Sequence, residues 1–502
     1  MPRHLETDVL IVGAGPTGLM VATCLARFGV RTVIIDPKSG PTRESRAIVL
    51  QARTMEILDQ LGIVDRFLHE ATVASEFRPG VRSRMFRPIQ LTRLAVGASP
   101  YPHLYVLEQS RTERILGERL ATDGRDISWG YRLESLAESG SGIRATASAD
   151  GDTLTVSARY CVGADGSGSA VRTMLGVEFD GATNAHTFYV LDAVGVRGLA
   201  LDSINVRLAA RNFLLTFPMA APDHERLLGS LPVAPDAELL ESTVRAMVGR
   251  EFSVSYDSSN WFATYRVHHR VARRFRVGGV FLAGDAAHVH SPVGAQGMNT
   301  GLQDAHNLAC KIADVMAGRR PDASLDRYES ERRPVALRLV STTDRMFAFV
   351  TSAGFVARAV RRLGARVVLP VVTRLVPRFA RARRIFEYLA QIRIHYWMDS
   401  TAKERSRGKR GRTVGRRLPY NGDNFDDLRL MRWQLHAYGT ALTEQICEAS
   451  ETLDLPVSTF PAVRNDRLVA GRLYLVRPDG FVAAESPPHS AVTVFSAAIR
   501  AR

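Results

Sequence analysis

Apolar residues occur along this chain in short, β-branched runs separated by stretches with helical spacing, a pattern typical of an α/β protein. The first run, Asp8–Val12, is followed by a helical stretch to about Phe28 and by a second run, Arg31–Ile35. This order predicts a strand, a helix and a second strand of one parallel sheet. The N-terminal part of the chain is therefore expected to contain a Rossmann-type sheet.

A third apolar run begins at Val280 and ends at Asp285, as expected for a buried strand that stops at a loop. The loop carries Pro292 and Gly297 before a helix that we expect from about Gly301. Glycine lets backbone N–H groups approach a ligand closely, and the positive end of the helix faces the same place. We expect a ligand-binding loop here, in which Asp285 accepts a hydrogen bond from a ribose or ribityl hydroxyl.

Other patterns mark the middle and the end of the chain. Short β-like runs between about 177 and 271 predict a mostly antiparallel sheet, and an arginine-rich helical region lies further on. The turn Pro478-Asp479-Gly480 between two apolar runs predicts a hairpin. We expect a Rossmann-type domain in two segments (1–176 and 272–345), a β-sheet domain (177–271), a helical connector (346–400) and a C-terminal domain (401–502).

Length and composition agree with a multidomain globular protein. A chain of 502 residues suggests about three domains, and 45% of its residues are hydrophobic and 23% charged. We find no signal-peptide pattern and no apolar run long enough to cross a membrane. The chain is expected to be cytoplasmic, without integral membrane association.

Charge and cysteine usage exclude two classes of function. The net charge is +15, but arginine is spread along the chain without a nucleic-acid-binding motif, so we expect no nucleic-acid partner. The four cysteines are scattered without CxxC or other metal-ligand spacing, so no metal site is expected and the thiols are expected to be reduced.

The first strand–helix pair carries a dinucleotide-binding pattern. It reads Gly13-x-Gly15-x-x-Gly18, and the second strand ends on Asp36. In this context Gly13 makes the tight turn, Gly15 admits the pyrophosphate and Gly18 lets helix and strand pack. Asp36 would accept hydrogen bonds from the ribose hydroxyls. The early position in the chain suggests FAD.

Two further motifs specify a family. The string Asp165-Gly166-x-x-Ser169-x-Val-Arg172 and the string GDAAHxxxPxGxxGxN, which starts at Gly284, follow in that order. Together with the glycine-rich turn they resemble the single-component FAD-dependent aromatic hydroxylases, the p-hydroxybenzoate hydroxylase-like flavoproteins. The last hundred residues resemble the thioredoxin-like C-terminal domain of the polyketide-hydroxylase branch, here with Cys447 alone in place of a redox pair. The resemblance implies a Rossmann-type FAD domain with an inserted antiparallel substrate domain, a helical connector and this C-terminal domain.

The resemblance also implies roles for individual residues. Arg46 would reach the flavin and position it, and Gln109 would hydrogen-bond the cofactor. Pro292 and Gly297 would stabilise the reduced flavin and its peroxide, together with the helix N-terminus. No protein acid or base is assigned, because His288 resembles a structural histidine of the family and catalysis by His288 or His290 is the weaker alternative. The cofactor-binding set implied is Gly13, Gly15, Gly18, Asp36, Arg46, Gln109, Asp165, Asp285, Pro292, Gly297, Met298 and Asn299.

For the substrate pocket the sequence offers only aromatic and apolar candidates. These are Phe213, Phe217, Met219 and Trp261, although aromatic residues on strands more often belong to the core. No polar cluster suited to a small benzoate can be assigned, so a bulky and largely apolar substrate is expected.

The expected reaction follows from the family resemblance. It is an NAD(P)H-consuming monooxygenation in which a flavin C4a-hydroperoxide hydroxylates a phenolic, polyketide-like aromatic substrate with O₂. No second glycine-rich βαβ motif exists, so NADPH is expected to be a transient co-substrate. A Baeyer–Villiger oxygenase or epoxidase on the same scaffold is the alternative, and a non-catalytic flavin- or aromatic-ligand-binding protein is a remote one. A monomer and a homodimer are equally compatible with the sequence.

Overall fold

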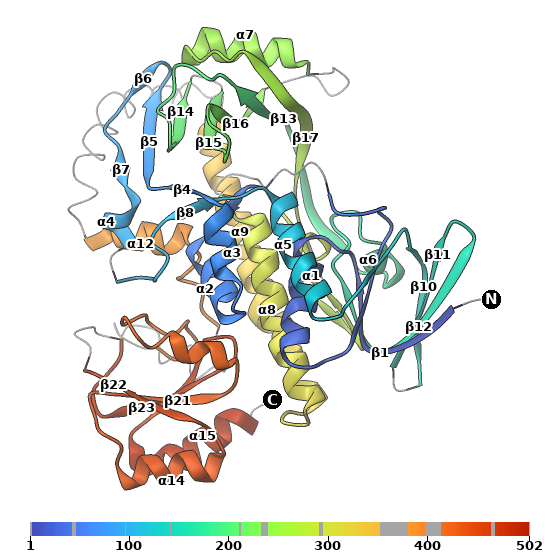
Figure 1. Cartoon of the computed structure of the whole chain (residues 1–502), viewed down its shortest axis with the longest axis vertical. Helices are drawn as coiled ribbons and strands as arrows, with labels where there is room; N and C mark the ends of the chain where they lie inside the picture. The colour runs from blue at the N-terminus through green and yellow to red at the C-terminus, as the bar shows by residue number, and fades with distance from the viewer. Residues whose placement is uncertain are drawn as a thin grey trace.

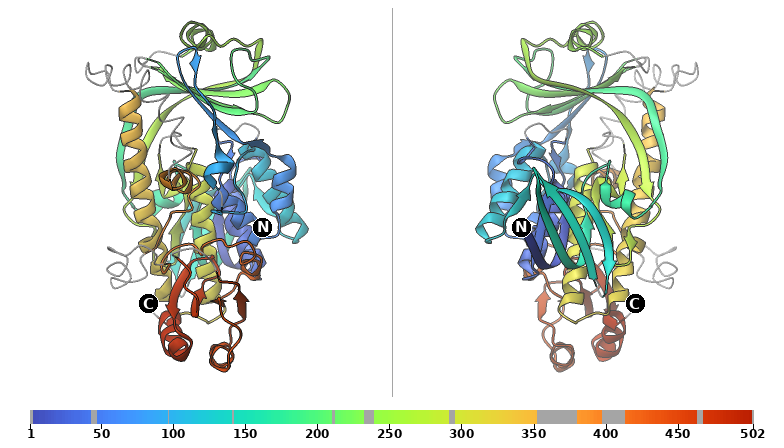
Figure 2. Two further views of the ribbon diagram at one scale, coloured as in Figure 1. Left: turned by 90° about the vertical axis from the view of Figure 1, so that its left-hand side faces the viewer. Right: turned by 90° about the vertical axis from the view of Figure 1, so that its right-hand side faces the viewer.

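The computed structural model of the chain describes residues 3–42, 47–95, 97–140, 142–209, 212–231, 239–290, 295–351, 380–396, 413–462 and 467–500. It has three parts along its longest axis: an upper sheet, a central sheet with its helices and a C-terminal unit at the opposite end (Figure 1). Figure 2 shows the same arrangement from two sides, with the C-terminal unit in red and most of the upper sheet in green. Arg46, Pro292 and most of the predicted connector 346–400 lie outside the described residues.

In the central sheet, the strands that precede the three sequence motifs are parallel to one another. Strand β1 pairs in parallel with β2 and β12, β2 pairs with β9, and the last residues of β12 pair with β19. The antiparallel strands β10 and β11 continue the sheet beside the first half of β12, and β18 pairs with β19. The strands are β1 (Arg3–Val12), β2 (Thr32–Asp36), β9 (Ile127–Trp129), β10 (Arg132–Ser139), β11 (Gly142–Ala149), β12 (Asp152–Gly163), β18 (Arg276–Val277) and β19 (Val280–Leu282).

The strand register brings the motifs to one edge of this sheet. Val12 is paired with Ile35 on one side and with Gly163 on the other, and Gly163 is paired with Leu282. Within a few residues of this row the chain enters the glycine-rich turn, Asp36, the motif that starts at Asp165 (the DG motif) and the motif that starts at Gly284 (the GD motif). Ligands of open α/β sheets bind at this carboxyl edge.

Helices cover the central sheet and connect it to the other parts. Helix α1 contacts both α5 and α8, and α9 lies against α8 (Figure 1). The helices of this part are α1 (Pro16–Arg27), α2 (Ala52–Gln60), α3 (Val64–Glu70), α4 (Leu91–Ala95), α5 (Gln109–Thr122), α6 (Ala170–Met174), α8 (Gly297–Met316), α9 (Asp326–Thr351) and α12 (Ala380–Leu389), with the 3-10 turns η1 (Gly284–Ala286) and η2 (Asp322–Leu325).

The upper sheet has the order β20-β17-β13-β16-β15-β14-β5-β6, with β7 paired to β5. Its pairs are antiparallel except for β14 with β5. Helix α7 (Glu241–Phe252) covers the outer face (Figure 1). The strands are β5 (Glu76–Val81), β6 (Arg84–Met85), β7 (Ile89–Gln90), β13 (Phe179–Val194), β14 (Ser203–Leu208), β15 (Phe213–Pro218), β16 (His224–Leu231), β17 (Ser258–Ala272) and β20 (His288–Val289).

Strands β5 to β7 were assigned by sequence to the first segment, 1–176, yet they extend the upper sheet. Their attachment depends on the parallel register of Ser203–Leu208 with Glu76–Val81, which links segments more than a hundred residues apart. No local pattern in either segment reveals such a pairing.

A small antiparallel sheet, β3-β8-β4, lies between the two large sheets (Figure 1). Its strand β4 is followed directly by β5 of the upper sheet. Its strands are β3 (Val49–Leu50), β4 (Thr72–Ala74) and β8 (Leu104–Val106). Val49, Ala74 and Val106 share one apolar cluster with Phe217 of the upper sheet. The inner face of the upper sheet is thereby fixed over residues 47–50.

The C-terminal unit has its own sheet, in the order β22-β21-β23-β24, with β21 and β22 parallel. Its hairpin turn enters the central part, where Arg477 makes buried ion pairs with Glu331 of α9 and with Asp479. Arg417 makes another buried pair with Glu56 of α2. The elements are η5 (Asp426–Leu430), β21 (Gln434–Tyr438), α14 (Glu444–Leu453), β22 (Val457–Phe460), β23 (Arg472–Val476), β24 (Val482–Ser486), η6 (Pro488–Ser490) and α15 (Ala491–Arg500).

Among the described helices, none combines the length and apolar character needed to cross a membrane.

Candidate functional site

The glycine-rich turn has the shape that a pyrophosphate requires. A Cβ on Gly13 would overlap the backbone of Ala164, and one on Gly18 would overlap the carbonyl oxygen of Gly13. In contrast, a Cβ on Gly15 would meet no atom within 4 Å. Gly15 is the N-cap of α1, so the open space lies where the helix offers its unpaired N–H groups. These observations are compatible with the three predicted roles, of which binding of the pyrophosphate stays a prediction.

Asp36 is buried at the end of β2 and orders the turn beside it. One carboxylate oxygen accepts a hydrogen bond from the backbone N of Ala14 at 2.7 Å, and the other accepts from the N of Lys38 at 2.8 Å. An ionised carboxylate has about four acceptor positions, so it can also receive ribose hydroxyls. The geometry is therefore compatible with the predicted role in binding the cofactor.

Gln109 is the first residue of α5 and contacts Ala47 and Glu113. Its backbone N donates to the carbonyl of Ala47 at 2.9 Å, and its Nε2 donates to Oε1 of Glu113 at 2.9 Å. The other oxygen of Glu113 accepts from the backbone N of Thr42 at 3.1 Å. Sequence reasoning missed Glu113, which bonds both Thr42 and the side chain of Gln109. An acidic residue one helical turn after the predicted glutamine was the available signal.

Asp165 of the DG motif organises its own turn. Its Oδ1 accepts from the hydroxyl of Ser169 at 2.5 Å and its Oδ2 from the backbone N of Val171 at 3.1 Å. Burial raises the pKa of Asp165, while these hydrogen bonds act in the opposite direction. Arg172 then links the motif to the third one, because its Nη1 donates to the carbonyl of Ala286 at 2.9 Å.

The third motif differs from its prediction in where the helix begins. Helix α8 starts at Gly297 and not near Gly301, so Met298 and Asn299 belong to its first turn. A Cβ on Gly301 would overlap Thr17 of α1, which makes Gly301 a contact between the two helices. The predicted loop residues at 297–299 therefore present the N–H groups of a helix N-terminus, which favours a negatively charged partner.

Asn299 is fully buried, and its side chain is used within the protein. Oδ1 accepts from the backbone N of Gln51 at 2.9 Å and from the hydroxyl of Thr54 at 2.7 Å. Nδ2 donates to the carbonyls of Val49 at 2.8 Å and Ala295 at 2.9 Å. The amide thus joins α8 to the β3–α2 segment, and any contact with a cofactor would come from its backbone N–H.

Asp285 lies on the turn η1 and is exposed, whereas its neighbours Gly284 and Ala286 are buried. The turn is held by Asp304 of α8, whose Oδ2 accepts from the backbone N of Gly284 at 3.2 Å. Asp285 therefore lies on a fixed turn at the carboxyl edge of the sheet, and its contact with a ribityl chain stays a prediction.

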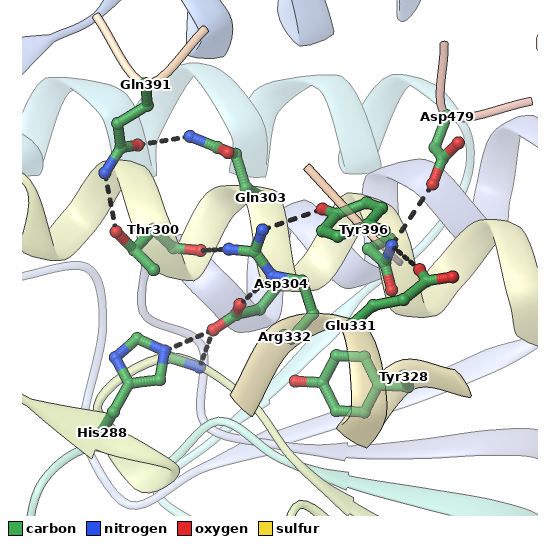
Figure 3. A network of polar contacts seen from close by, with 12 residues as sticks. His288, Thr300, Gln303, Asp304, Tyr328, Glu331, Arg332, Gln391, Tyr396 and Asp479 are labelled. Carbon is green, nitrogen blue, oxygen red and sulfur yellow. Dashed lines mark hydrogen bonds and ion pairs between the residues drawn. The ribbon is translucent and has the colours of Figure 1, made fainter. Parts of the chain in front are cut away.

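Asp304 is the centre of a buried polar network that the sequence did not reveal (Figure 3). Its Oδ2 lies 2.6 Å from Nε2 of His288, and its Oδ1 accepts from Nε of Arg332 at 2.6 Å. Although burial raises the pKa of Asp304, the charge of Arg332 and the contact with His288 lower it below its ordinary value overall. His288 is buried and bonded to Asp304, which is compatible with the predicted structural role.

The network continues into the last part of the chain. Arg332 donates from Nη1 to the hydroxyl of Tyr396 at 2.9 Å and from Nη2 to the carbonyl of Thr300 at 3.2 Å. Tyr396 stacks on Phe481, with ring centroids 4.2 Å apart. The first turn of α8, where the third motif ends, is thereby connected to the C-terminal unit.

The predicted substrate residues lie on the upper sheet. Phe213 and Phe217 are buried, and Met219 and Trp261 are partly exposed. Phe217 packs in the cluster that also contains Ala295, two residues before α8. The cluster that contains Phe217 therefore contacts the residue at position 295, close to the start of α8.

Sequence reasoning missed one charged group on this sheet. Arg226 of β16 donates from Nε and Nη2 to the two carboxylate oxygens of Asp192 on β13, at 2.6 and 2.7 Å. Its guanidinium also lies 5.2 Å from the ring centroid of Trp261. Strand alternation could have placed Arg226 on one face, but not opposite Asp192.

Comparisons with known proteins agree with this geometry. A family model described as an FAD binding domain matches residues 6–343. The chain is 36% identical over 411 residues to 6-methylpretetramide 4-monooxygenase of Streptomyces rimosus, covering 79% of this chain and 71% of that protein. It is 31% identical over 496 residues to a rifampicin monooxygenase of Rhodococcus hoagii, covering 95% of each. Among solved structures, the OxyS anhydrotetracycline hydroxylase from Streptomyces rimosus aligns with a TM-score of 0.77 at 27% identity, covering 99% of both chains.

Proposed function

The chain belongs to the family of FAD-dependent aromatic hydroxylases, and we propose that it hydroxylates a bulky, polycyclic phenol of polyketide type with NADPH and O₂. The observation that carries the proposal is the meeting of three FAD motifs at one sheet edge beneath an aromatic-lined sheet. The relatives named for pretetramide and rifampicin oxidation support a large substrate.

The residues present fit FAD. Gly15 leaves open space at the N-terminus of α1 for the pyrophosphate, and Asp36 would hold the adenosine ribose. Asp285 would hold the ribityl chain, and the backbone N–H groups of Gly297 and Met298 would face the polar edge of the flavin. Bound FAD supplies the electron transfer from the nicotinamide and the activation of O₂.

The protein itself has to position the ring of the cofactor and exclude water from it. The network of Asp304, His288 and Arg332 fixes the turn η1 and the start of α8 in relation to each other. Arg46 and Pro292 stay predictions for flavin positioning, since they lie outside the described residues. NADPH would bind transiently, without a nucleotide-binding domain of its own.

We further propose that the C-terminal unit is thioredoxin-like. Its order β21-α14-β22-β23-β24-α15, with one parallel and two antiparallel pairs, supports this assignment. Cys447 is the one cysteine between residues 401 and 502, so the unit would have a structural or oligomerisation role without disulfide exchange. The predicted segments 1–176, 177–271, 272–345 and 346–400 are kept, with 76–90 contributing to the substrate-binding sheet.

The visible spectrum of the purified protein and its NADPH consumption test the proposal. A yellow protein whose NADPH oxidation under air is stimulated by polycyclic phenols, with a product heavier by one oxygen atom, is expected. A product that hydrolyses as an ester would identify Baeyer–Villiger oxygenation instead. NADPH oxidation that no phenol stimulates would contradict the proposed function.

A further inference from the structure

Gln391 occupies a backbone position that usually belongs to glycine. It follows helix α12 in the left-handed region, with φ of +57°. Its backbone N donates to the carbonyl of Tyr388 at 3.1 Å, and the N of Ile392 donates to the carbonyl of Glu387 at 2.9 Å. This is the Schellman pattern of helix ends, in which glycine is favoured at the left-handed position because a Cβ there costs free energy. Glutamine at this position therefore indicates a role for its side chain.

The side chain of Gln391 is buried and connects the end of α12 with α8 (Figure 3). Its Nε2 donates to the hydroxyl of Thr300 at 2.8 Å, and its Oε1 accepts from Nε2 of Gln303. The Thr300 hydroxyl in turn donates to the carbonyl of Gln296 at 2.8 Å. Gln296 is the N-cap of α8, and the same carbonyl accepts from the backbone N of Thr300. A line of hydrogen bonds thus leads from Gln391 to the first turn of α8.

Two separate segments hold this first turn. Asn299 bonds it to the β3–α2 segment, and the next residue, Thr300, bonds it to Gln391. The N–H groups that the helix leaves unpaired include those of Gly297 and Met298, which we expect to face the flavin. Their direction follows the helix axis, so it depends on both attachments.

We propose that Gln391 is a positioning residue for the flavin: through Thr300 it holds the first turn of α8 in the orientation in which its N–H groups stabilise the reduced, negatively charged ring. The inference rests on the proposed function and assigns Gln391 no contact with the cofactor. A helix N-terminus carries partial positive charge, so a change in its orientation weakens the binding of an anion more than that of a neutral ring. Gln391 thereby favours the reduction of bound FAD.

The midpoint potential of bound FAD tests the proposal. Its difference from the potential of free FAD gives the ratio of the affinities for reduced and oxidised FAD, and it is measured by slow reduction of the holoenzyme together with a reference dye. Gln391→Gly suits the left-handed backbone and removes the amide. The ratio should fall about 5-fold, which corresponds to a potential about 20 mV lower for a two-electron couple.

Variants of Thr300 break the same contact from the other side. Thr300→Val removes the hydroxyl with little change of shape and should lower the potential to a similar extent. Combined with Gln391→Gly it should add little, because both changes interrupt one line of hydrogen bonds. Thr300→Ser retains the hydroxyl and should restore the wild-type potential.

The matched control is Asp454→Gly in the C-terminal unit. Asp454 follows α14 with φ of +52° and an exposed side chain. The Schellman pattern is the same, since its N donates to the carbonyl of Glu451 and the N of Leu455 donates to that of Ser450. The control relieves the same backbone strain and should leave the midpoint potential unchanged.

The outcomes are distinct. An unchanged potential in Gln391→Gly, whatever its thermal stability, would assign the glutamine a purely structural role and overturn the proposal. If this variant does not fold, an unchanged potential in Thr300→Val overturns it in the same way. An equal decrease in Asp454→Gly would also overturn it. The proposed function fails separately, because it requires phenol-stimulated NADPH oxidation, which the measurement of the potential does not use.

Discussion

Nε of Arg332 lies 2.6 Å from Oδ1 of Asp304, and neither side chain is exposed to solvent. Arg332 belongs to α9 and Asp304 to α8, so the pair joins the two long helices of the central part. The same carboxylate accepts from the backbone N of Gly284, where the strand β19 ends. One buried ion pair thus fixes the place at which the third flavin motif leaves the sheet.

Replacing Asp304 by asparagine should destabilise the protein strongly. The change keeps the shape of the side chain but leaves the buried charge of Arg332 without its counter-ion, which costs about 3–5 kcal/mol. Urea unfolding followed by circular dichroism measures the loss. The control is Asp8→Asn, which breaks the surface pair with Arg31 and should cost far less, because solvent screens an exposed pair. Similar losses of unfolding free energy in both variants would show that the buried ion pair stabilises the protein no more than the exposed one.

Lys311 should make stability depend on pH in the alkaline range. Burial, together with the nearby charge of Arg477, lowers the pKa of Lys311 from 10.5 to about 8, although Glu331 acts in the opposite direction. Between these two pKa values the unfolded chain binds more protons than the folded one at this site, so its contribution to the unfolding free energy rises with pH. The unfolding free energy of the wild type minus that of Lys311→Met should therefore be flat below about pH 7 and increase from pH 8 to pH 10. A difference that decreases over this range would contradict the assignment.

Two glycines of the first motif should respond differently to alanine. A Cβ at position 15 would occupy open space, so Gly15→Ala should fold with a melting temperature close to wild type in the absence of cofactor, yet lose FAD affinity by about 10-fold or more. A Cβ at position 18 would overlap the backbone of Gly13, so Gly18→Ala should lose about 1–3 kcal/mol of stability even without FAD. Thermal unfolding and bound-flavin absorbance distinguish the two. Equal loss of stability in both would mean that the space beside Gly15 is not a ligand cradle.

The cysteines should differ in their reaction with a thiol reagent. Cys24, Cys161 and Cys310 are buried, and burial raises the pKa of each thiol, whereas Cys447 is exposed. The native protein should therefore react rapidly with Ellman's reagent at one thiol, and the denatured protein at four. Cys447→Ser should remove the rapid phase. Two or more rapid thiols in the native protein would show that the central part opens locally.

The glycine-rich turn and the position of Asp36 at the end of β2 were predictable because both depend on local geometry within one strand–helix–strand unit. The start of α8 was placed four residues too late, since the glycine at position 297 was interpreted as part of a loop although it is the first residue of the helix. Sequence also identified the family, and the comparisons confirm it.

The polar partners could not be predicted in the same way. Arg226 meets Asp192 only because two strands pair in one register, and Arg332 meets Asp304 only because two helices cross at that point. Such contacts join residues 34 and 28 positions apart, which leaves no periodic signal in the sequence. Phe217 was proposed from its residue type alone. Its position in a cluster that also contacts Ala295 is known only from the structure.

The buried turn of the C-terminal unit has a consequence for how the protein is made. Glu331 emerges from the ribosome 146 residues before Arg477, its partner in two buried hydrogen bonds. Until Arg477 has been synthesised, Glu331 of α9 has its ion pair with Lys311 of α8 but not the one with Arg477. The ion pairs that join α9 to the C-terminal unit can therefore form only after the β23–β24 hairpin has been translated, late in the synthesis of the chain.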